Sequence, residues 1–352
     1  MKKWWYRRIL IIVTVLSTVL GTGFAIQKIE TEEQNQQVSS EATGVLKVIP
    51  GGVPIGIYLE TDGIYVLGTD HIFCHDGIER APAENIIHAG DYIMGINGVE
   101  VTDKKTLIRC VKELQSDEAI LSIRREEEKM DVKVHAVLDE NEEYKLGIWV
   151  KDNIQGLGTL TFLTEDNSFG ALGHGIHDSE SDELLEISEG SVYETSIIGV
   201  KKGESGNPGG LKGVIAYNPY KKIGEIVENS ESGIKGVISE TERLSLTEEA
   251  MEVASKEEIE IGKATILCTI EDEVEEYEIR ITNTNRYSKH ENKAIMLEVT
   301  DEALIEKTGG IVQGLSGSPI IQNGKLVGAV THVLVNDPTR GYGIFIEDML
   351  EH

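Results

Sequence analysis

From residue 144 onward the chain is a succession of short apolar runs separated by Gly, Asn and Asp, and this rhythm most constrains the fold. Runs of about four to eight residues between turn-forming residues are typical of β-strands. Many such strands in succession predict an all-β sandwich or barrel. One helix is expected within this region, over 246–255, with Thr247 as its N-cap. The runs span 146–150, 156–163, 197–200, 211–216, 233–237, 264–270, 277–282 and 294–299.

A segment with a different pattern precedes this β-rich region. Gly90-Asp91 leads into the apolar run 92–96, and Asn97-Gly98 leads out of it as a tight turn. Thr102-Asp103 is expected to cap a helix over 104–114, whose apolar residues recur at helical spacing. The alternating runs 119–124 and 130–137 are expected to close the segment as strands.

This segment is similar to the PDZ modules of bacterial proteins. Such modules add an extended peptide to an exposed sheet edge, beside a glycine-rich loop that holds a terminal carboxylate. The resemblance places the peptide-binding loop at Gly51, Gly52, Val53 and Ile55, where a glycine pair opens onto an alternating strand. A passive spacer role for the module remains open.

The N-terminus has the pattern of a membrane segment. Residues 1–8 carry four basic side chains and no acid, and residues 9–26 carry no charge. About 20 apolar residues span a bilayer, so 1–26 is expected to be a signal peptide or an uncleaved signal anchor. The lack of a clean small-x-small cleavage site favours the anchor, with the body translocated. The polar residues 27–43 are expected to form a linker.

Charge and cysteine content exclude several classes of function. The chain has 61 Asp and Glu against 33 Lys and Arg, a net charge of −28, which argues against nucleic-acid binding. The three cysteines, Cys74, Cys110 and Cys268, are too few and too scattered for a disulfide framework. They are interpreted as buried thiols, although the sequence also allows a single disulfide between two of them. No His-Glu-x-x-His motif occurs, and we expect neither a metal nor an organic cofactor.

A loop of small residues surrounds one serine in Gly314-Leu315-Ser316-Gly317-Ser318-Pro319. Glycines allow the backbone amides of residues 314 and 316 to point inward together, as an oxyanion hole requires. A glycine-rich turn with an incidental serine explains the same six residues equally well.

A second loop of small residues places His174 between Gly173 and Gly175. A serine nucleophile needs a general base, and histidine has the pKa for that role. The residues alone leave two other roles open: a metal site formed with His177 and Asp178, or a buried structural histidine.

The histidine loop (169–176) and the serine loop (308–325) together resemble those of the stage IV B sporulation peptidase family (SpoIVB), chymotrypsin-like serine peptidases that carry a PDZ module. The resemblance covers nearly the whole chain. It implies a membrane segment (1–26), a linker (27–43), a PDZ-like domain (44–138) and a double β-barrel peptidase domain (139–352). It also implies that Ser316 is the nucleophile, His174 the base and Asp301 the acid that orients His174, with the amides of Gly314 and Ser316 as the oxyanion hole.

Some of these roles have competitors. Asp301 lies where a strand is expected to turn into a helix, so an N-cap is its alternative role. Asp178 and Asp337 are further candidates for the acid. Ser318 replaces the second glycine of the Gly-x-Ser-Gly-Gly-Pro pattern and is a minor rival nucleophile. His332 is expected either to line the substrate cleft or to pack.

The resemblance further implies self-cleavage near the N-terminus and action between the two membranes around the forespore. There the enzyme would cleave a membrane protein that restrains an intramembrane metalloprotease, which then activates a late sporulation sigma factor. Expected partners are this protein substrate, a peptide or the chain's own N-terminal region on the PDZ module, and the membrane through residues 9–26. Two other functions remain open: an inactive PDZ scaffold, and a general extracytoplasmic quality-control protease, in which the PDZ module normally follows the peptidase.

Overall fold

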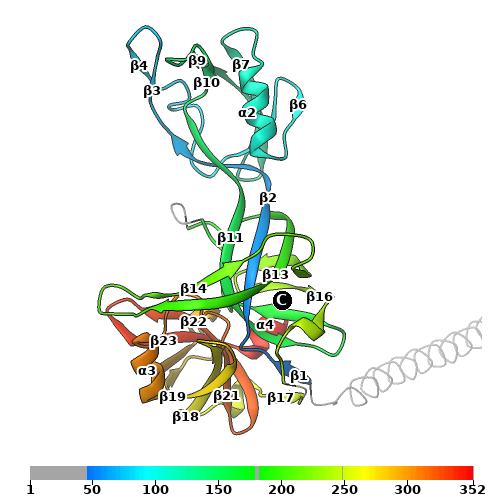
Figure 1. The fold of residues 1–352 in the computed structure, drawn as a ribbon, viewed down its shortest axis with the longest axis vertical. Helices are drawn as coiled ribbons and strands as arrows, with labels where there is room; N and C mark the ends of the chain where they lie inside the picture. Colours follow the sequence, from blue (N-terminus) through cyan, green and yellow to red (C-terminus); the bar gives the residue numbers. More distant parts are fainter. Residues whose placement is uncertain (1–45, 179–181, 248, 352) are drawn as a thin grey trace, which may run out of the picture. The chain divides into compact units, whose positions relative to one another are not determined.

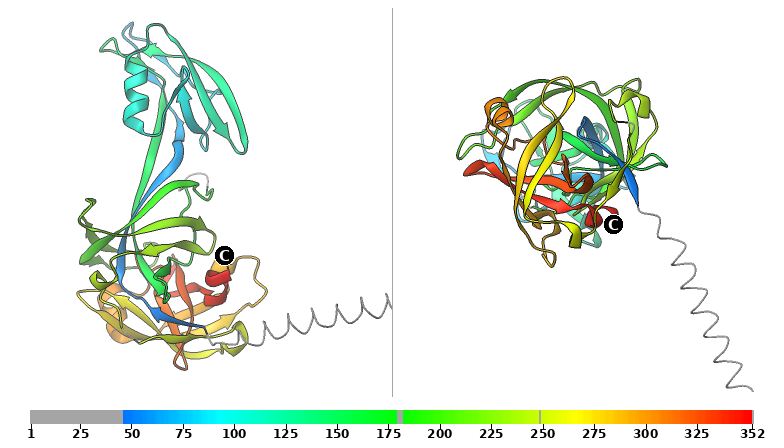
Figure 2. Two further views of the ribbon diagram at one scale, coloured as in Figure 1. Left: turned by 90° about the vertical axis from the view of Figure 1, so that its right-hand side faces the viewer. Right: turned by 90° about the horizontal axis from the view of Figure 1, so that it is seen from below.

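The computed structural model describes residues 46–178, 182–247 and 249–351. The expected membrane segment 9–26 and the linker 27–43 lie outside these residues. None of the helices within the described ranges has both the length and the hydrophobicity needed to cross a membrane. The architecture is mainly β, as the sequence predicts, with two closed antiparallel barrels and a smaller mixed module (Figures 1 and 2).

The first barrel closes through the antiparallel pairings β2–β13–β15–β16–β12–β11–β2. Its buried core includes Ile55, Ile57, Leu160 and Val192. The strands are β1 (Lys47–Pro50), β2 (Pro54–Thr69), β11 (Ile148–Leu163), β12 (Ser168–Ala171), β13 (Ile187–Lys201), β14 (Gly210–Ile215), β15 (Lys222–Ser230) and β16 (Gly233–Ile238).

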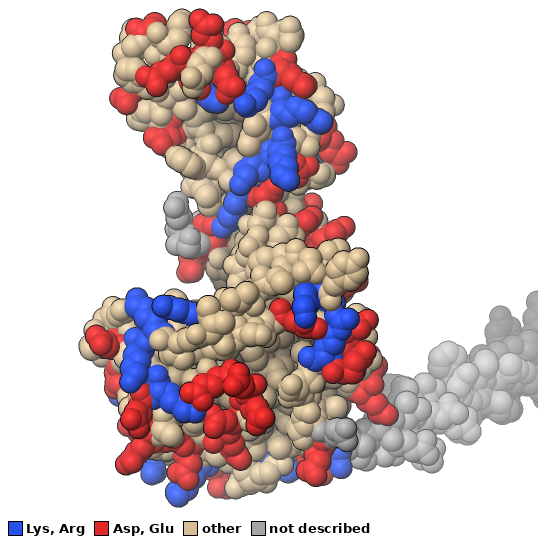
Figure 3. Space-filling view, viewed as in Figure 1, with Lys and Arg blue, Asp and Glu red and all other residues tan. Residues whose placement is uncertain are grey.

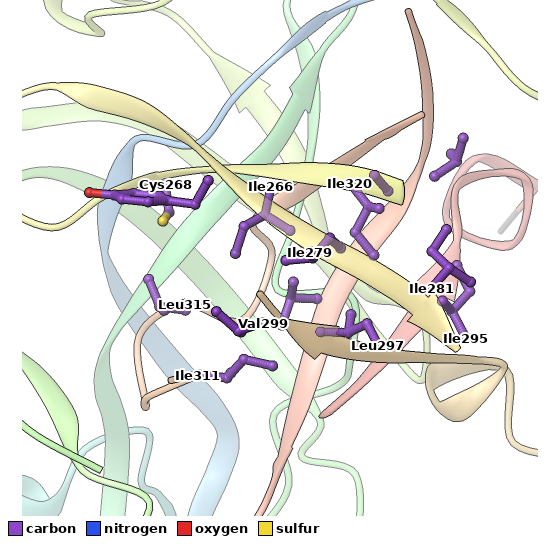
Figure 4. Packing of buried hydrophobic residues seen from close by; sticks show 14 of the residues in the cluster. Ile266, Cys268, Ile279, Ile281, Ile295, Leu297, Val299, Ile311, Leu315 and Ile320 are labelled. Carbon is purple, nitrogen blue, oxygen red and sulfur yellow. The ribbon is translucent and has the colours of Figure 1, made fainter. Parts of the chain in front are cut away.

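The second barrel closes through β18–β19–β20–β23–β22–β21–β18. Figure 4 shows its core, where Ile266, Ile279, Leu297 and Ile320 point toward one another from four strands. Acidic side chains gather over β18, β19 and α3 in the face shown in Figure 3. The elements are β17 (Met251–Val253), β18 (Gly262–Thr269), β19 (Val274–Thr284), β20 (Ile295–Val299), α3 (Glu302–Thr308), β21 (Pro319–Gln322), β22 (Lys325–Leu334), β23 (Asp337–Phe345) and α4 (Ile346–Glu351), with short 3-10 turns η1 (Thr241–Arg243), η2 (Lys256–Glu258) and η3 (Glu291–Lys293).

The smaller module has a core of its own around Ile93, Leu107 and Leu121. The predicted helix forms as α2, and the Asp103 side chain caps it by accepting from the Thr106 amide. Asn97 and Gly98 both have positive φ, as the predicted tight turn requires. The elements are β3 (Ile72–Phe73), β4 (Glu79–Arg80), β5 (Tyr92–Ile96), β6 (Val99–Glu100), α2 (Lys104–Lys112), β7 (Glu118–Arg125), β8 (Glu128–His135), β9 (Val137–Leu138) and β10 (Tyr144–Lys145).

The chain enters and leaves this module through two long strands, β2 and β11, which pair from Pro54–Thr159 to Thr69–Ile148. One end of each strand packs in the first barrel, and the other end packs in the core of the module. The module is therefore inserted into the barrel. The predicted boundary at residue 44 was wrong in this respect, because 47–59 supply barrel strands.

The helix predicted over 246–255 does not form in its described part. Met251 and Glu252 pair instead with β1, and Glu252 and Val253 pair in parallel with β22. Met251 and Val253 thereby pack against a buried cluster of apolar side chains. Strand pairing with two distant segments outweighs the local helix preference of the sequence.

Candidate active site

The serine loop lies between α3 and β21, and its backbone conformation requires two glycines. Gly314 and Gly317 have φ angles of 98° and 97°, which side-chain-bearing residues rarely adopt. A Cβ atom on Gly317 would lie 2.0 Å from the Thr159 carbonyl oxygen. Ser316 is part-buried, and its hydroxyl donates to the Thr331 carbonyl at 2.8 Å.

Strand β11 of the first barrel holds this loop through two buried threonines. The Thr159 amide donates to the Ser316 carbonyl at 3.0 Å, and its hydroxyl donates to the Gly314 carbonyl at 2.7 Å. The Thr161 hydroxyl donates to the Gly317 carbonyl at 2.8 Å. The serine loop of one barrel is thus fixed by a strand of the other.

The two amides predicted to form the oxyanion hole have fixed directions. The Gln313 carbonyl accepts from the Leu211 amide at 2.8 Å, and the Leu315 carbonyl accepts from the Ser318 amide at 3.0 Å. In a trans peptide the N–H points opposite to the C=O, so these bonds direct the following amides, those of Gly314 and Ser316. Within the described part of the chain, neither amide donates a hydrogen bond to a protein group, and both are available to a ligand.

His174 follows β12 in a loop that turns sharply at Leu172 and Gly173, with φ angles of 71° and 70°. Its Nδ1 lies 2.8 Å from the Gly175 carbonyl oxygen. This carbonyl acts as acceptor, so Nδ1 carries the proton and Nε2 has a free lone pair. Burial, opposed by the Gly175 carbonyl and assisted by nearby His177, lowers the pKa of His174 from its usual value.

His174, Gly314 and Ser316 line the same cavity, which has a volume of about 490 Å³. Its walls are largely apolar and include Ile57 and Val333, and no described Asp, Glu, Lys or Arg lines it. The sequence prediction that these three residues meet agrees with this arrangement. No hydrogen bond joins Ser316 to His174 among the described contacts, since the hydroxyl is directed to Thr331.

The structure does not bring Asp301 to His174. One carboxylate oxygen of Asp301 accepts from the Ala303 and Leu304 amides at 2.9 and 3.1 Å, and the other accepts from the Glu278 amide at 3.2 Å. The side chain is therefore the N-cap of α3, which is the alternative role that the sequence left open. Three backbone donors hold this carboxylate in the second barrel.

The two fallback acids also have other partners. The buried Asp178 carboxylate forms an ion pair with the partly exposed Lys151 at 2.7 Å, and Asp337 accepts from the Thr339 amide and hydroxyl. The group that holds His174 in the structure is a backbone carbonyl, which no residue-type pattern in the sequence reveals.

The other residues considered for the site, His177, Ser318 and His332, have different surroundings. His177 contacts the Asp182 carbonyl and lies 3.4 Å from Glu231, and the described residues contain no group of three potential metal ligands. Ser318 is completely buried and does not line the cavity of Ser316. His332 lines this cavity, and its ring centroid is 5.0 Å from that of His174.

The peptide-binding loop predicted at Gly51 and Gly52 was wrong. Their amides donate to the carbonyls of Thr161 and Leu160 at 2.9 and 2.8 Å, and Val53 and Ile55 are buried in the first barrel. A glycine pair before a strand occurs here because a Cβ atom on Gly51 would lie 2.1 Å from the Leu160 carbonyl oxygen.

The smaller module does have a cavity, of about 410 Å³, between α2 and residues 144–150. Leu107, Ile108 and Trp149 are among the apolar residues that line it. The sequence signal for this place is Leu146-Gly147-Ile148, a glycine between apolar residues, and Gly147 has a φ of 67°. The sequence alone does not single out this place, because Gly51-Gly52 also fits the order expected for the module.

A comparison with family models agrees with the family resemblance. The family model for SpoIVB peptidase S55 matches residues 142–350, and no curated protein is matched. Similar solved structures include the PDZ domain of the SdrC-like protein from Listeria monocytogenes, which is 21% identical, with 25% of this chain and 87% of that chain covered and a TM-score of 0.21. The Rv3671c protease from M. tuberculosis in its active form is 12% identical, with 56% and 74% covered and a TM-score of 0.30. Deg5 is 13% identical, with 56% and 80% covered and a TM-score of 0.33.

At these scores the solved structures carry no argument about the site. The family model, in contrast, matches more than half of the chain, including both the histidine loop and the serine loop. The chain belongs to the SpoIVB peptidase S55 family and is a serine peptidase.

Proposed function

We propose that Ser316 is the nucleophile, that His174 is its general base, and that the amides of Gly314 and Ser316 stabilise the oxyanion. The observation that carries this proposal is the pair of free amides, each directed by a hydrogen bond on the carbonyl of its own peptide group. They border the cavity that also contains His174. Donors fixed in advance toward a developing negative charge are among the largest contributions to acyl-transfer catalysis.

The reaction needs one rearrangement of the resting site. The Ser316 hydroxyl leaves the Thr331 carbonyl by rotation about its Cα–Cβ bond and donates to Nε2 of His174. The oxygen then attacks the substrate carbonyl, His174 takes the proton, and His174 later returns it to the leaving amine. The Gly175 carbonyl holds the proton on Nδ1 throughout, so that Nε2 remains the basic atom.

The proposed substrate is a protein at a membrane surface, and the smaller module docks a peptide. The apolar cavity beside α2 supports the second part, because PDZ modules bind extended peptides between a helix and a strand edge. Trp149 lines this cavity and is the one Trp among the described residues, so its fluorescence reports binding. Peptides with an apolar free C-terminus should change the Trp149 emission, and Ile108→Glu should abolish the change.

We further propose that the enzyme acts in sporulation signalling. It would be anchored through residues 9–26, cleave its own N-terminal region, and act from the intermembrane space of the forespore. There it would cut a regulatory membrane protein and so trigger intramembrane processing of a late sigma factor. Membership of the SpoIVB peptidase family and the apolar N-terminal segment support this proposal.

The test is self-cleavage of the full chain in detergent, followed on gels with N-terminal sequencing of the products. Wild type should shorten its N-terminal region with time, and Ser316→Ala should remain intact. Ser318→Ala is the matched control, because it removes a neighbouring hydroxyl that has no hydrogen-bond partner, and it should cleave like wild type. If neither wild type nor Ser318→Ala cleaves itself or reacts with a fluorophosphonate, the inactive-scaffold function replaces this one.

A further inference from the structure

His332 is a half-buried titratable group that the proposed mechanism does not use. It lies on β22, directly after Thr331, whose carbonyl holds the Ser316 hydroxyl. The His332 and His174 rings are 5.0 Å apart between centroids, with planes inclined by 40°. This distance is within the range of direct contact between aromatic rings, about 4.5–7 Å.

One nitrogen of His332 has no partner. Its Nδ1 is buried and makes no hydrogen bond to any described group. The Asn292 backbone opposes the lowering of the His332 pKa, as a nearby carbonyl acceptor does, and because Nδ1 is unpaired we assign the ring N–H to Nε2. Nδ1 therefore carries a lone pair without a donor. Native structures leave few buried polar atoms in this state, since each has lost its hydrogen bonds to water without a replacement.

Burial and the groups around the ring keep it neutral. Burial lowers the pKa of His332 to about 4, and nearby His174, Lys293 and His177 act in the same direction. Tyr342 is its partner across the strand pair with β23. At neutral pH the ring is thus an acceptor and does not compete for the proton of Ser316.

A hydrogen-bond donor for the lone pair on Nδ1 of His332 forms during the reaction. When His174 takes the proton from Ser316 it becomes an imidazolium in a cavity that no described carboxylate lines. We infer that His332 is a positioning residue for this reaction: its ring packs against His174, and its Nδ1 accepts a hydrogen bond from Nε2–H of the imidazolium until the leaving amine takes this proton. The proton stays on His174 and is then passed to the leaving amine, so no further proton acceptor is needed. This inference rests on the proposed roles of Ser316 and His174.

The test compares His332→Phe with His332→Asn in the full chain. Phe keeps an aromatic ring but has no acceptor, whereas Asn offers an acceptor without the ring. Inactivation by a fluorophosphonate is measured at several probe concentrations from pH 4.5 to 8.5. The dependence on concentration gives the maximal inactivation rate and the affinity for the probe separately, and no known substrate is needed. Thermal melts establish that each variant is folded.

We expect His332→Phe to lower the maximal inactivation rate by roughly 10- to 100-fold, the loss of one hydrogen bond to a charged group, with little change in probe affinity. The acid side of its pH–rate profile should have its midpoint at lower pH, because the imidazolium of His174 loses an acceptor. His332→Asn should be inactivated faster than His332→Phe, and the midpoint of its pH–rate profile should lie closer to that of wild type. If His332 only packs against its neighbours, the order of the two rates is reversed: His332→Phe is active and His332→Asn is impaired. This result would overturn the inference.

The failure of this inference differs from failure of the proposed function. If Ser316→Ala and His174→Ala are inert while His332→Phe matches wild type in rate and in the midpoint of its pH–rate profile, only the role of His332 is refuted. If Ser316→Ala still reacts with the probe, the proposed nucleophile itself is wrong. If both His332 variants fail to fold, His332 is a structural residue and the inference is also overturned.

Discussion

Replacement of Thr159 by Val tests whether β11 holds the serine loop in the shape that the proposed catalysis requires. Thr159 is 2% exposed, and its hydroxyl donates to the Gly314 carbonyl at 2.7 Å. Valine has the same shape but no donor, so the carbonyl beside the oxyanion hole loses this partner. Leaving a buried acceptor unsatisfied costs about 1–3 kcal/mol of unfolding free energy. We expect a loss in this range together with a lower kcat.

The effect on kcat has an upper bound. Complete removal of one oxyanion donor costs about 10²- to 10³-fold, and a loosened loop should cost less, about tenfold. Urea unfolding gives the stability, and the maximal rate of fluorophosphonate inactivation gives the reactivity of Ser316. Thr159→Ser is the matched control, since it keeps the hydroxyl and should retain most of both quantities. Equal losses in Thr159→Ser and Thr159→Val, or no loss in Thr159→Val, would refute the reasoning.

Three further predictions follow from the site. Leu211→Pro removes the amide that holds the Gln313 carbonyl and should lower the inactivation rate by roughly tenfold or more, whereas Leu211→Ala should not; equal rates would contradict the assigned direction of the Gly314 amide. Asp301→Asn should leave the rate within a few-fold of wild type and Asp301→Ala should cost about 0.5–2 kcal/mol of stability, whereas a loss near 10⁴-fold would restore Asp301 as the orienting acid. The rate should rise with pH as His174 loses its proton, and because burial lowers this pKa from its usual 6.5, a midpoint above pH 7 would contradict the assignment.

Features set by local chemistry were predictable from the sequence. The turn at Asn97-Gly98 has positive φ at both residues, and α2 begins at its expected cap. The small-residue loops around His174 and Ser316 were recognisable because glycine is required where φ is positive or the backbone is crowded.

Features that depend on distant partners were not predictable. Gly51-Gly52 has the same local pattern in a carboxylate-binding loop and in a barrel, and only the bonds to Leu160 and Thr161 decide between them. An aspartate before a helix, such as Asp301, can serve either as the acid that orients His174 or as the N-cap of the helix. The sequence contains no information on its distance from His174. The insertion of the smaller module depends on pairing between β2 and β11, which are far apart along the chain.

The most direct test of the central claim is the mass-spectrometric location of a fluorophosphonate adduct on the full chain. The account predicts a single adduct on Ser316 that disappears in both Ser316→Ala and His174→Ala and persists in Asp301→Asn. An adduct on Ser318, or labelling that survives in Ser316→Ala, would contradict the assignment of Ser316 as the nucleophile.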